Sequence, residues 1–230
     1  MTTLQLLETT PHEVVVCKPP NLAAELPRAP DADSLITRLR SAGFDDLRLV
    51  HRLDAPACGV MVVARTPEAA AHYGAELAGR RWQKVYVAEV AAAVDHATAI
   101  VGKHKAYLTT AGHRARLVRA GGKPSFLTVL GAWPSPQAAD RSHVLVHLHT
   151  GRFHQIRVML AGLGAPLVGD TTYGGPGGPF YLEHVLLAAR PYSSTNPRVW
   201  AAPAHEGRPV WSPGLLEAVR TQASVILAEV

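Results

Sequence analysis

The sequence predicts an α+β fold, a single domain with a mixed, mainly antiparallel sheet flanked by helices. Hydrophobic residues make up 47% of the 230 residues and charged residues 18%, so the chain can bury a substantial core. Short β-branched runs bounded by turn-forming residues recur along the chain and are typical of strands. Between them lie a few segments with apolar residues at helical spacing, which predict helices against the sheet.

Strands and helices are expected to alternate in the first half of the chain. A β-branched run over Glu13–Lys18 ends at the turn-forming Pro19-Pro20-Asn21 and predicts a strand. Apolar residues at helical spacing then predict a short helix, capped by Asp33 or Ser34. The other elements expected here are extended segments at 47–53, 59–64 and 84–90, and a helix over 69–79 that Pro67 opens.

The second half follows the same plan and ends in a helix. Extended segments are expected at 125–130 and 143–149, and apolar residues at helical spacing predict a helix within 151–163. After a proline-containing stretch at 197–213, the last residues predict an amphipathic helix that packs against the rest of the domain.

The chain is basic, with 23 Lys and Arg against 18 Asp and Glu, a formal net charge of +5 and a pI of about 9.5. This balance favours a polyanionic partner, but it fits equally well a protein that the charge merely keeps in solution. Cys17 and Cys58 have no metal-ligand spacing, so a disulfide framework and a zinc site are not indicated. No secretion signal and no apolar run near the ~20 residues that cross a bilayer is present, and we expect a cytoplasmic protein without membrane contact.

Signatures of nucleotide hydrolases, serine hydrolases and zinc proteases are absent, but three segments combine ionisable groups with glycines and strands. The first is His51-Arg52-Leu53-Asp54, directly before an apolar strand. A partly buried carboxylate needs a positioned cation to stay ionised, and Arg152 and Arg157 in a later segment could supply it. For Asp54 alone, helix capping or a surface ion pair is the stronger alternative.

The remaining segment is 84–90, where strict alternation places Tyr86 on the same strand face as Lys84. An isolated aromatic on a strand usually belongs to the core. An aromatic beside basic residues can instead stack on an extruded base, which contributes ~1 to 3 kcal/mol per base. Whether Tyr86 is a core residue or stacks on a base depends on the function that the other segments indicate.

Taken together, the segments resemble the RluA-like branch of the pseudouridine synthases. They are His51-Arg52-Leu53-Asp54, Lys84-Val85-Tyr86 and 151–157, followed by Val168-Gly169-Asp170 and Tyr173-Gly174, all in the family's order. The resemblance runs from 14–20 to about 187–188 and covers most of the chain. It implies one pseudouridine synthase catalytic domain over 1–230, and no segment before the first strand is long enough for a separate N-terminal RNA-binding module.

The resemblance implies that uridine in RNA is isomerised by breaking its bond to nitrogen, turning the uracil and rejoining it through carbon, without a metal or organic cofactor. Asp54 is then the nucleophile or covalent partner, and Arg157 is the arginine that pairs with it. Tyr86 would stack on the target uracil and assist proton removal. Because a stacked base is out of reach, the uridine must flip out, and Arg52 is the candidate to fill the gap, with a phosphate contact as the alternative.

RNA contacts are expected near this site and in a basic, glycine-containing region over 103–123 that includes a mobile loop. The residues assigned to RNA binding are Arg52, Lys84, Arg114, Arg116, Arg152, His154 and Gln155. A solvated charged face is the alternative for the basic region. His147 and His149 have no acidic or Cys ligand beside them, so no metal site is expected. The expected partner is an rRNA or tRNA stem-loop, bound by a monomer.

Several positions depart from the family pattern without removing a proposed catalytic group. Phe153 and Met159 stand where Thr and His are usual, and Ala57-Cys58 replaces Thr-Ser. These changes bear on RNA preference, and they leave open a non-catalytic RNA-binding or ribosome-assembly factor of the same fold. A small-molecule lyase or hydrolase that uses Asp54 and Arg157 is a further alternative, but it does not explain the excess of basic over acidic residues.

Overall fold

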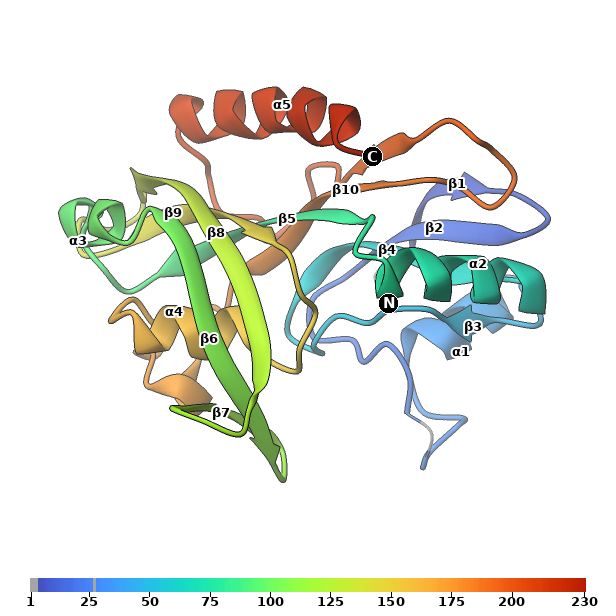
Figure 1. The fold of residues 1–230 in the computed structure, drawn as a ribbon, viewed down its shortest axis with the longest axis horizontal. Helices are drawn as coiled ribbons and strands as arrows, with labels where there is room; N and C mark the ends of the chain where they lie inside the picture. Colours follow the sequence, from blue (N-terminus) through green and yellow to red (C-terminus); the bar gives the residue numbers. More distant parts are fainter. Residues whose placement is uncertain (1–3, 27) are drawn as a thin grey trace. The chain divides into compact units, whose positions relative to one another are not determined.

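The computed structural model describes residues 4–26 and 28–230 and confirms the α+β fold, with a mainly antiparallel sheet flanked by helices (Figure 1). The chain forms two compact units. The first unit contains Met1–Gln83, His184–Pro203 and Val225–Val230, and the second contains Lys84–Glu183 and Ala204–Ser224. In the described part of the chain, no helix has the length and apolar character needed to cross a membrane.

The sheet of the first unit has the strand order β1-β2-β4-β10. Its strands are β1 (Gln5–Thr9), β2 (Glu13–Lys18), β4 (Cys58–Ala64) and β10 (Leu182–Ala189), with β3 (Arg48–Leu49) on β4 and β11 (Arg198–Ala201) on β10. Helices α1 (Leu35–Ser41) and α2 (Pro67–Ala78) belong to the same unit. Its core packs β-branched residues of β2 and β4, such as Val15 and Val62, against Tyr73 and Trp82.

The predicted helix starts are confirmed by their caps. Ser34, not Asp33, caps α1 through a capping box with Thr37, and the Asp33 carboxylate pairs with Arg38 instead. Thr66 caps α2 with proline in its first turn, as predicted.

The extended segment predicted at 47–53 is much shorter in the structure, where only Arg48–Leu49 pairs with β4. The next backbone donor on this side of β4, the Val62 amide, is bonded at 3.0 Å to the ring nitrogen Nε2 of His51. The strand ends because a side chain takes the hydrogen bond that strand pairing would need.

The second unit is built on the strand order β5-β9-β8-β6-β7, and every neighbouring pair is antiparallel. The strands are β5 (Gln83–Val90), β6 (Gly102–Ala111), β7 (Arg114–Val118), β8 (Lys123–Pro134) and β9 (Ser142–Leu148). The helices are α3 (Val94–Ala99), α4 (Gln155–Gly162), the short 3-10 helix η1 (Thr171–Tyr173) and α5 (Pro213–Ala228), whose last residues belong to the first unit.

Strand register assigns side chains to the two faces of this sheet. Tyr86 lies opposite Val146, which lies opposite Val129, so these residues share one face. On that face α4 packs against β7, and a Cβ added to Gly162 would lie 2.3 Å from a methyl carbon of Leu117. We call this the α4 face and the other the opposite face.

The structure defines two predicted segments of this unit more closely. Most of the basic region over 103–123 is strand, because β6 and β7 form a hairpin with a turn at Gly112-His113, and the mobile loop expected within it stays a prediction. The alternating charged side chains of this region are the exposed positions of strands. The predicted helix within 151–163 is confirmed as α4, which begins at Gln155 because His154 has a left-handed backbone (φ 51°) that a right-handed helix cannot include.

Candidate active site

Asp54, in the first unit, lies in a tight turn that enters β4. Its carbonyl oxygen accepts a hydrogen bond from the Ala57 amide at 3.1 Å, and the neighbouring Leu53 is buried and anchors the turn. The Asp54 side chain is half-buried and that of Arg52 is exposed. A carboxylate at the solvent boundary and an exposed guanidinium beside it are positioned to meet a bound molecule.

The buried side chain of Lys18 stabilises this turn through hydrogen bonds to backbone carbonyls, a role that we did not predict from the sequence. Its side chain is fully buried, and Nζ donates to the carbonyls of Pro19 (2.9 Å), Leu22 (2.7 Å) and Ala55 (3.1 Å). Burial lowers the pKa of Lys18 to about 8, while Cys58 and Asp54 act in the opposite direction. The amine therefore keeps most of its charge at neutral pH and interacts electrostatically with the nearby Asp54.

Gly59 fixes the start of β4 after the turn. Its φ of +111° disfavours any residue with a side chain, and an added Cβ would lie 2.3 Å from the carbonyl oxygen of His184. The His184 ring is bonded to the Val60 carbonyl through Nδ1 at 2.7 Å. Close contact between two strands thus sets where the chain leaves the Asp54 turn.

Arg157, in the second unit, forms a buried bidentate ion pair with Asp170. Nε donates to one carboxylate oxygen at 2.7 Å and a terminal nitrogen donates to the other at 2.8 Å. The guanidinium also lies over the rings of Tyr173 (5.2 Å) and Phe180 (5.5 Å). Asp170 was part of the recognised motif, but we assigned it no role, and the pairing of Arg157 with Asp54 stays a prediction.

Tyr86 and Lys84 are both buried, and alternation along β5 places them on the α4 face. Burial lowers the pKa of Lys84 to about 8. A Cβ added to Gly151 would lie 3.4 Å from Lys84 Nζ, so the amine lies against the loop that leads into α4. A buried amine there stabilises this loop more readily than it reaches a phosphate, and its RNA contact stays a prediction.

The loop before α4 is organised by Gln155, whose side chain is buried. Its amide oxygen accepts from the Thr150 hydroxyl at 2.8 Å and from the Arg152 amide at 3.0 Å, and its nitrogen donates to the Phe126 carbonyl at 3.1 Å. The side chain of Arg152 is exposed. Gln155 therefore suits a positioning role, while Arg152 is available for the predicted RNA contact.

A single hydroxyl joins the hairpin to the start of α4. The Tyr173 hydroxyl accepts from the Ala115 amide at 2.8 Å and lies 2.9 Å from Nδ1 of His154, whose ring stacks on Phe153 at 3.8 Å. Because the phenol has one hydrogen, this geometry lets it donate to His154.

An open hollow of about 410 Å³ lies beside this hydroxyl, between β7 and α4. Arg114 and Arg116 line it together with Leu117, and both arginines are exposed. The two predicted RNA contacts thus border one concave surface with Tyr173. Their exposure permits the phosphate contacts that we assigned to them.

Comparisons with known proteins identify the family of the chain. The family model described as RNA pseudouridylate synthase matches residues 12–162. The dual-specificity RNA pseudouridine synthase RluA of Escherichia coli K12 is 30% identical over 196 residues, which cover 84% of this chain and 88% of that protein. The ribosomal large subunit pseudouridine synthase D of Pseudomonas aeruginosa is 32% identical over 182 residues, 75% of this chain but only 54% of the relative. The chain therefore spans about half the length of that relative.

Solved structures share the fold. Human RNA pseudouridylate synthase domain containing 1 has a TM-score of 0.72 at 23% identity, with 94% of each chain covered. Human RNA pseudouridylate synthase domain containing 4 has a TM-score of 0.68 at 18% identity, with 88% of this chain and 89% of that chain covered. From the family match and the RluA relative, the chain belongs to the RluA-like branch of the RNA pseudouridylate synthase family, whose members are isomerases that act on RNA.

Proposed function

We propose that this chain converts uridine to pseudouridine in structured RNA, with Asp54 as the nucleophile. The match to the family model carries the proposal, because it spans residues 12–162 and includes both the Asp54 turn and Arg157. The buried Lys18 supports it further, since its charge interacts with Asp54 and its hydrogen bond to the Ala55 carbonyl fixes the backbone beside the nucleophile. The relative named for the ribosomal large subunit makes rRNA the first substrate to test, and tRNA the second.

The reaction needs one bond broken, one bond formed and one proton moved. The carboxylate of Asp54 attacks the ribose carbon of the flipped nucleotide and forms a bond to it, while the bond between this carbon and the uracil nitrogen breaks; the new bond breaks again when the uracil rejoins the ribose. The released uracil turns, its carbon joins the ribose in place of nitrogen, and Asp54 is freed. The proton on that carbon is lost and the nitrogen gains one, so product and substrate have the same composition. No metal or organic cofactor enters this scheme.

The other site residues have supporting roles in the proposal. Tyr86 stacks on the uracil and helps to remove the proton, while Arg157 is the arginine that we expect to pair with the reacting carboxylate. Arg52 is exposed beside Asp54 and can take the place of the flipped base. Arg114, Arg116 and Arg152 are exposed cations that hold the phosphates. We propose that the protein acts as a monomer in the cytoplasm, where it meets its RNA.

The decisive experiment compares Asp54→Asn with the matched control Asp45→Asn, which changes an exposed aspartate in the same unit. Pseudouridine is mapped in ribosomal RNA and tRNA incubated with each protein. We expect Asp54→Asn to lower the rate by at least roughly a thousandfold and to leave RNA affinity within about twofold, because a nucleophile cannot be replaced by an amide. Activity that survives Asp54→Asn contradicts the assignment of the nucleophile.

A second candidate, a non-catalytic RNA-binding or ribosome-assembly factor of the same fold, is favoured by one observation. Phe153, where the family pattern has Thr, stacks directly on His154 at the start of α4. Wild-type protein that binds these RNAs but forms no pseudouridine in either would support this candidate.

A further inference from the structure

The opposite face of the second unit carries an exposed group of aromatic and basic side chains away from Tyr86. Val85 lies opposite His147, His147 opposite Thr128 and Thr128 opposite Lys103, so these residues share the face that α4 does not cover. Phe126 lies two residues before Thr128 and directly opposite Lys105. Lys103, Lys105 and Phe126 therefore lie on the sheet face opposite that of Tyr86.

We define the aromatic platform as Tyr107, Phe126, Lys103 and Lys105. The two rings are half-buried and the two lysines are exposed. Lys105 Nζ lies 5.2 Å from the centre of the Tyr107 ring and 5.8 Å from that of Phe126, so one cation faces both rings. In the described part of the chain, neither lysine is paired with a carboxylate.

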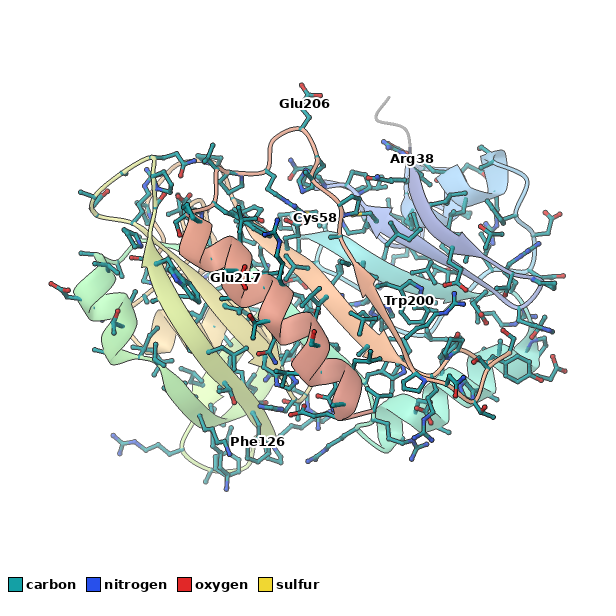
Figure 2. All side chains as sticks on the ribbon, turned by 90° about the horizontal axis from the view of Figure 1, so that it is seen from above. Arg38, Cys58, Phe126, Trp200, Glu206 and Glu217 are labelled. Carbon is teal, nitrogen blue, oxygen red and sulfur yellow. The ribbon has the colours of Figure 1, made fainter. Side chains whose placement is uncertain are left out.

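Helix α5 covers the other end of the same face. A β-bulge between Val129 and Gly131 places Trp133 on this face opposite His143, and a Cβ on Gly214 of α5 would lie 3.0 Å from the Trp133 ring. In Figure 2, Phe126 projects from the strand ends at a distance from α5 and its Glu217. The platform is thus the uncovered end of a partly covered sheet face.

Charge is strongly one-sided in the stretch of sequence that contains the platform. The segment 96–169 contains nine Lys and Arg and one acidic residue, Asp140, whereas the rest of the chain contains fourteen Lys and Arg and seventeen acidic residues. The basic character of the protein is therefore due entirely to this segment. Asp140 follows the far end of β8, while Phe126 is near its beginning, so the only acid is remote from the platform along the strand.

We propose that the aromatic platform binds a single-stranded part of the RNA, with an unpaired base stacked on Tyr107 and Phe126 and the adjoining phosphates on Lys103 and Lys105. Accessible rings interleaved with cations on a sheet are the arrangement that single-stranded nucleic acid recognises, and a half-buried ring still offers one face. This inference rests on the proposed function only for the class of ligand. It adds a second place of contact, on the sheet face opposite that of Tyr86.

The test measures the affinity of two labelled RNAs by fluorescence anisotropy, an oligouridylate of about a dozen nucleotides and a blunt duplex. In the double variant Tyr107→Leu with Phe126→Leu, we expect oligouridylate binding to weaken by roughly tenfold or more and duplex binding to change by less than about twofold. Tyr107→Phe keeps the ring and should keep the affinity. The control Tyr192→Leu changes a partly exposed aromatic of the first unit and should have no effect.

The lysines are tested through the salt dependence of binding. The double variant Lys103→Gln with Lys105→Gln should bind both RNAs more weakly. It should also reduce the slope of log affinity against log salt by about one to two, because two phosphate contacts are lost. The control Arg220→Gln removes an exposed cation of α5 in the same unit and should leave the slope within about half a unit.

Unchanged oligouridylate affinity in the Leu double variant, with the fold verified by circular dichroism, overturns the platform. A loss of oligouridylate affinity in Tyr107→Phe as large as that in the Leu double variant overturns stacking as its basis. Pseudouridine formation is measured on the same wild-type protein. Activity without platform-dependent binding refutes only the platform, and platform-dependent binding without activity refutes only the proposed enzyme.

Discussion

The Asp54 turn and the Arg157 site each hold an ionisable group in place, but by different means. Lys18 is buried beside the turn and donates hydrogen bonds to three backbone carbonyls. Arg157 has a carboxylate partner, Asp170, and two rings over its guanidinium. The first arrangement fixes the backbone around a half-buried acid, whereas the second fixes a buried charge with a buried countercharge. The stability of the turn should therefore depend on backbone geometry, and the stability of the Arg157 site on the balance between its buried charges.

The largest effect is expected where charge balance is broken. Asp170→Asn leaves the Arg157 guanidinium buried beside a neutral amide and should lower the free energy of unfolding by about 3–5 kcal/mol. The double variant Arg157→Met with Asp170→Leu removes both charges and should recover a large part of that loss, although it loses activity. Urea unfolding measures both, and a double variant as unstable as Asp170→Asn contradicts the role of charge balance.

Gly59→Ala tests the dependence of the turn on backbone geometry. The added carbon meets the His184 backbone at a φ of +111°, and we expect a loss on the order of 3 kcal/mol in the free energy of unfolding. Gly43 has a φ of +89° with nothing near an added Cβ, so Gly43→Ala should lose only about 1 kcal/mol. Equal losses in thermal or urea unfolding would show that the close contact with His184 does not matter.

The buried lysines, Lys18 in the first unit and Lys84 in the second, predict a pH dependence of stability. Burial lowers both pKa values to about 8, below the ~10.4 of an unfolded lysine, so the unfolded chain binds more protons between these values. The free energy of unfolding should therefore rise from pH 8 towards pH 10, by on the order of 1 kcal/mol per pH unit for each lysine. Above pH 10 the rise is opposed by Tyr73, because burial raises the pKa of its phenol.

Each lysine can be assigned its share of this rise. Lys18→Met and Lys84→Met should each remove about half of the slope measured by urea unfolding at several pH values. Arg220→Gln, which changes an exposed and permanently charged side chain, should leave the slope as in the wild type. A full slope in Lys18→Met would show that its amine is not buried.

The smallest effect is expected at the hydroxyl of Tyr173. Tyr173→Phe leaves the buried amide of Ala115 without its partner and should lower the free energy of unfolding by about 1 kcal/mol. Tyr192→Phe, which alters a partly exposed phenol, is the matched control and should change it by less than about half that amount. A loss in Tyr173→Phe no larger than the control contradicts the role of this hydroxyl.

Elements with strong local signals were predictable from the sequence. Each of these signals is confined to a few neighbouring residues and can therefore be seen in the sequence alone. They are the β-branched run of β2, the capping residues of α1 and α2, and the alternation of β5. The hairpin of β6 and β7 was missed because its exposed lysines and arginines were interpreted as a loop. The strand β10 was not predicted, although its last five residues, Val185–Ala189, are all apolar.

The site was predictable only where chemistry is local. Asp54, Tyr86 and Arg157 stand in recognisable segments, but their partners are remote in sequence. Lys18 meets the Ala55 carbonyl across 37 positions, and Arg157 meets Asp170 across 13. The sequence offered one signal for each partner: Lys18 ends an apolar run before Pro19-Pro20, and Asp170 follows the largely apolar run 165–169. Neither signal says which atoms it will meet, because tertiary packing decides that.

The contact of Tyr173 with Ala115 has a consequence for how such a chain can diverge. The hydroxyl anchors the hairpin near its base in β7, while the tip at Gly112-His113 is exposed. Residues inserted at the tip would lengthen the hairpin without disturbing the anchor or α4. Descendants of this sequence could thus acquire new RNA preferences through insertions at one exposed turn, with the Arg157 site inherited unchanged.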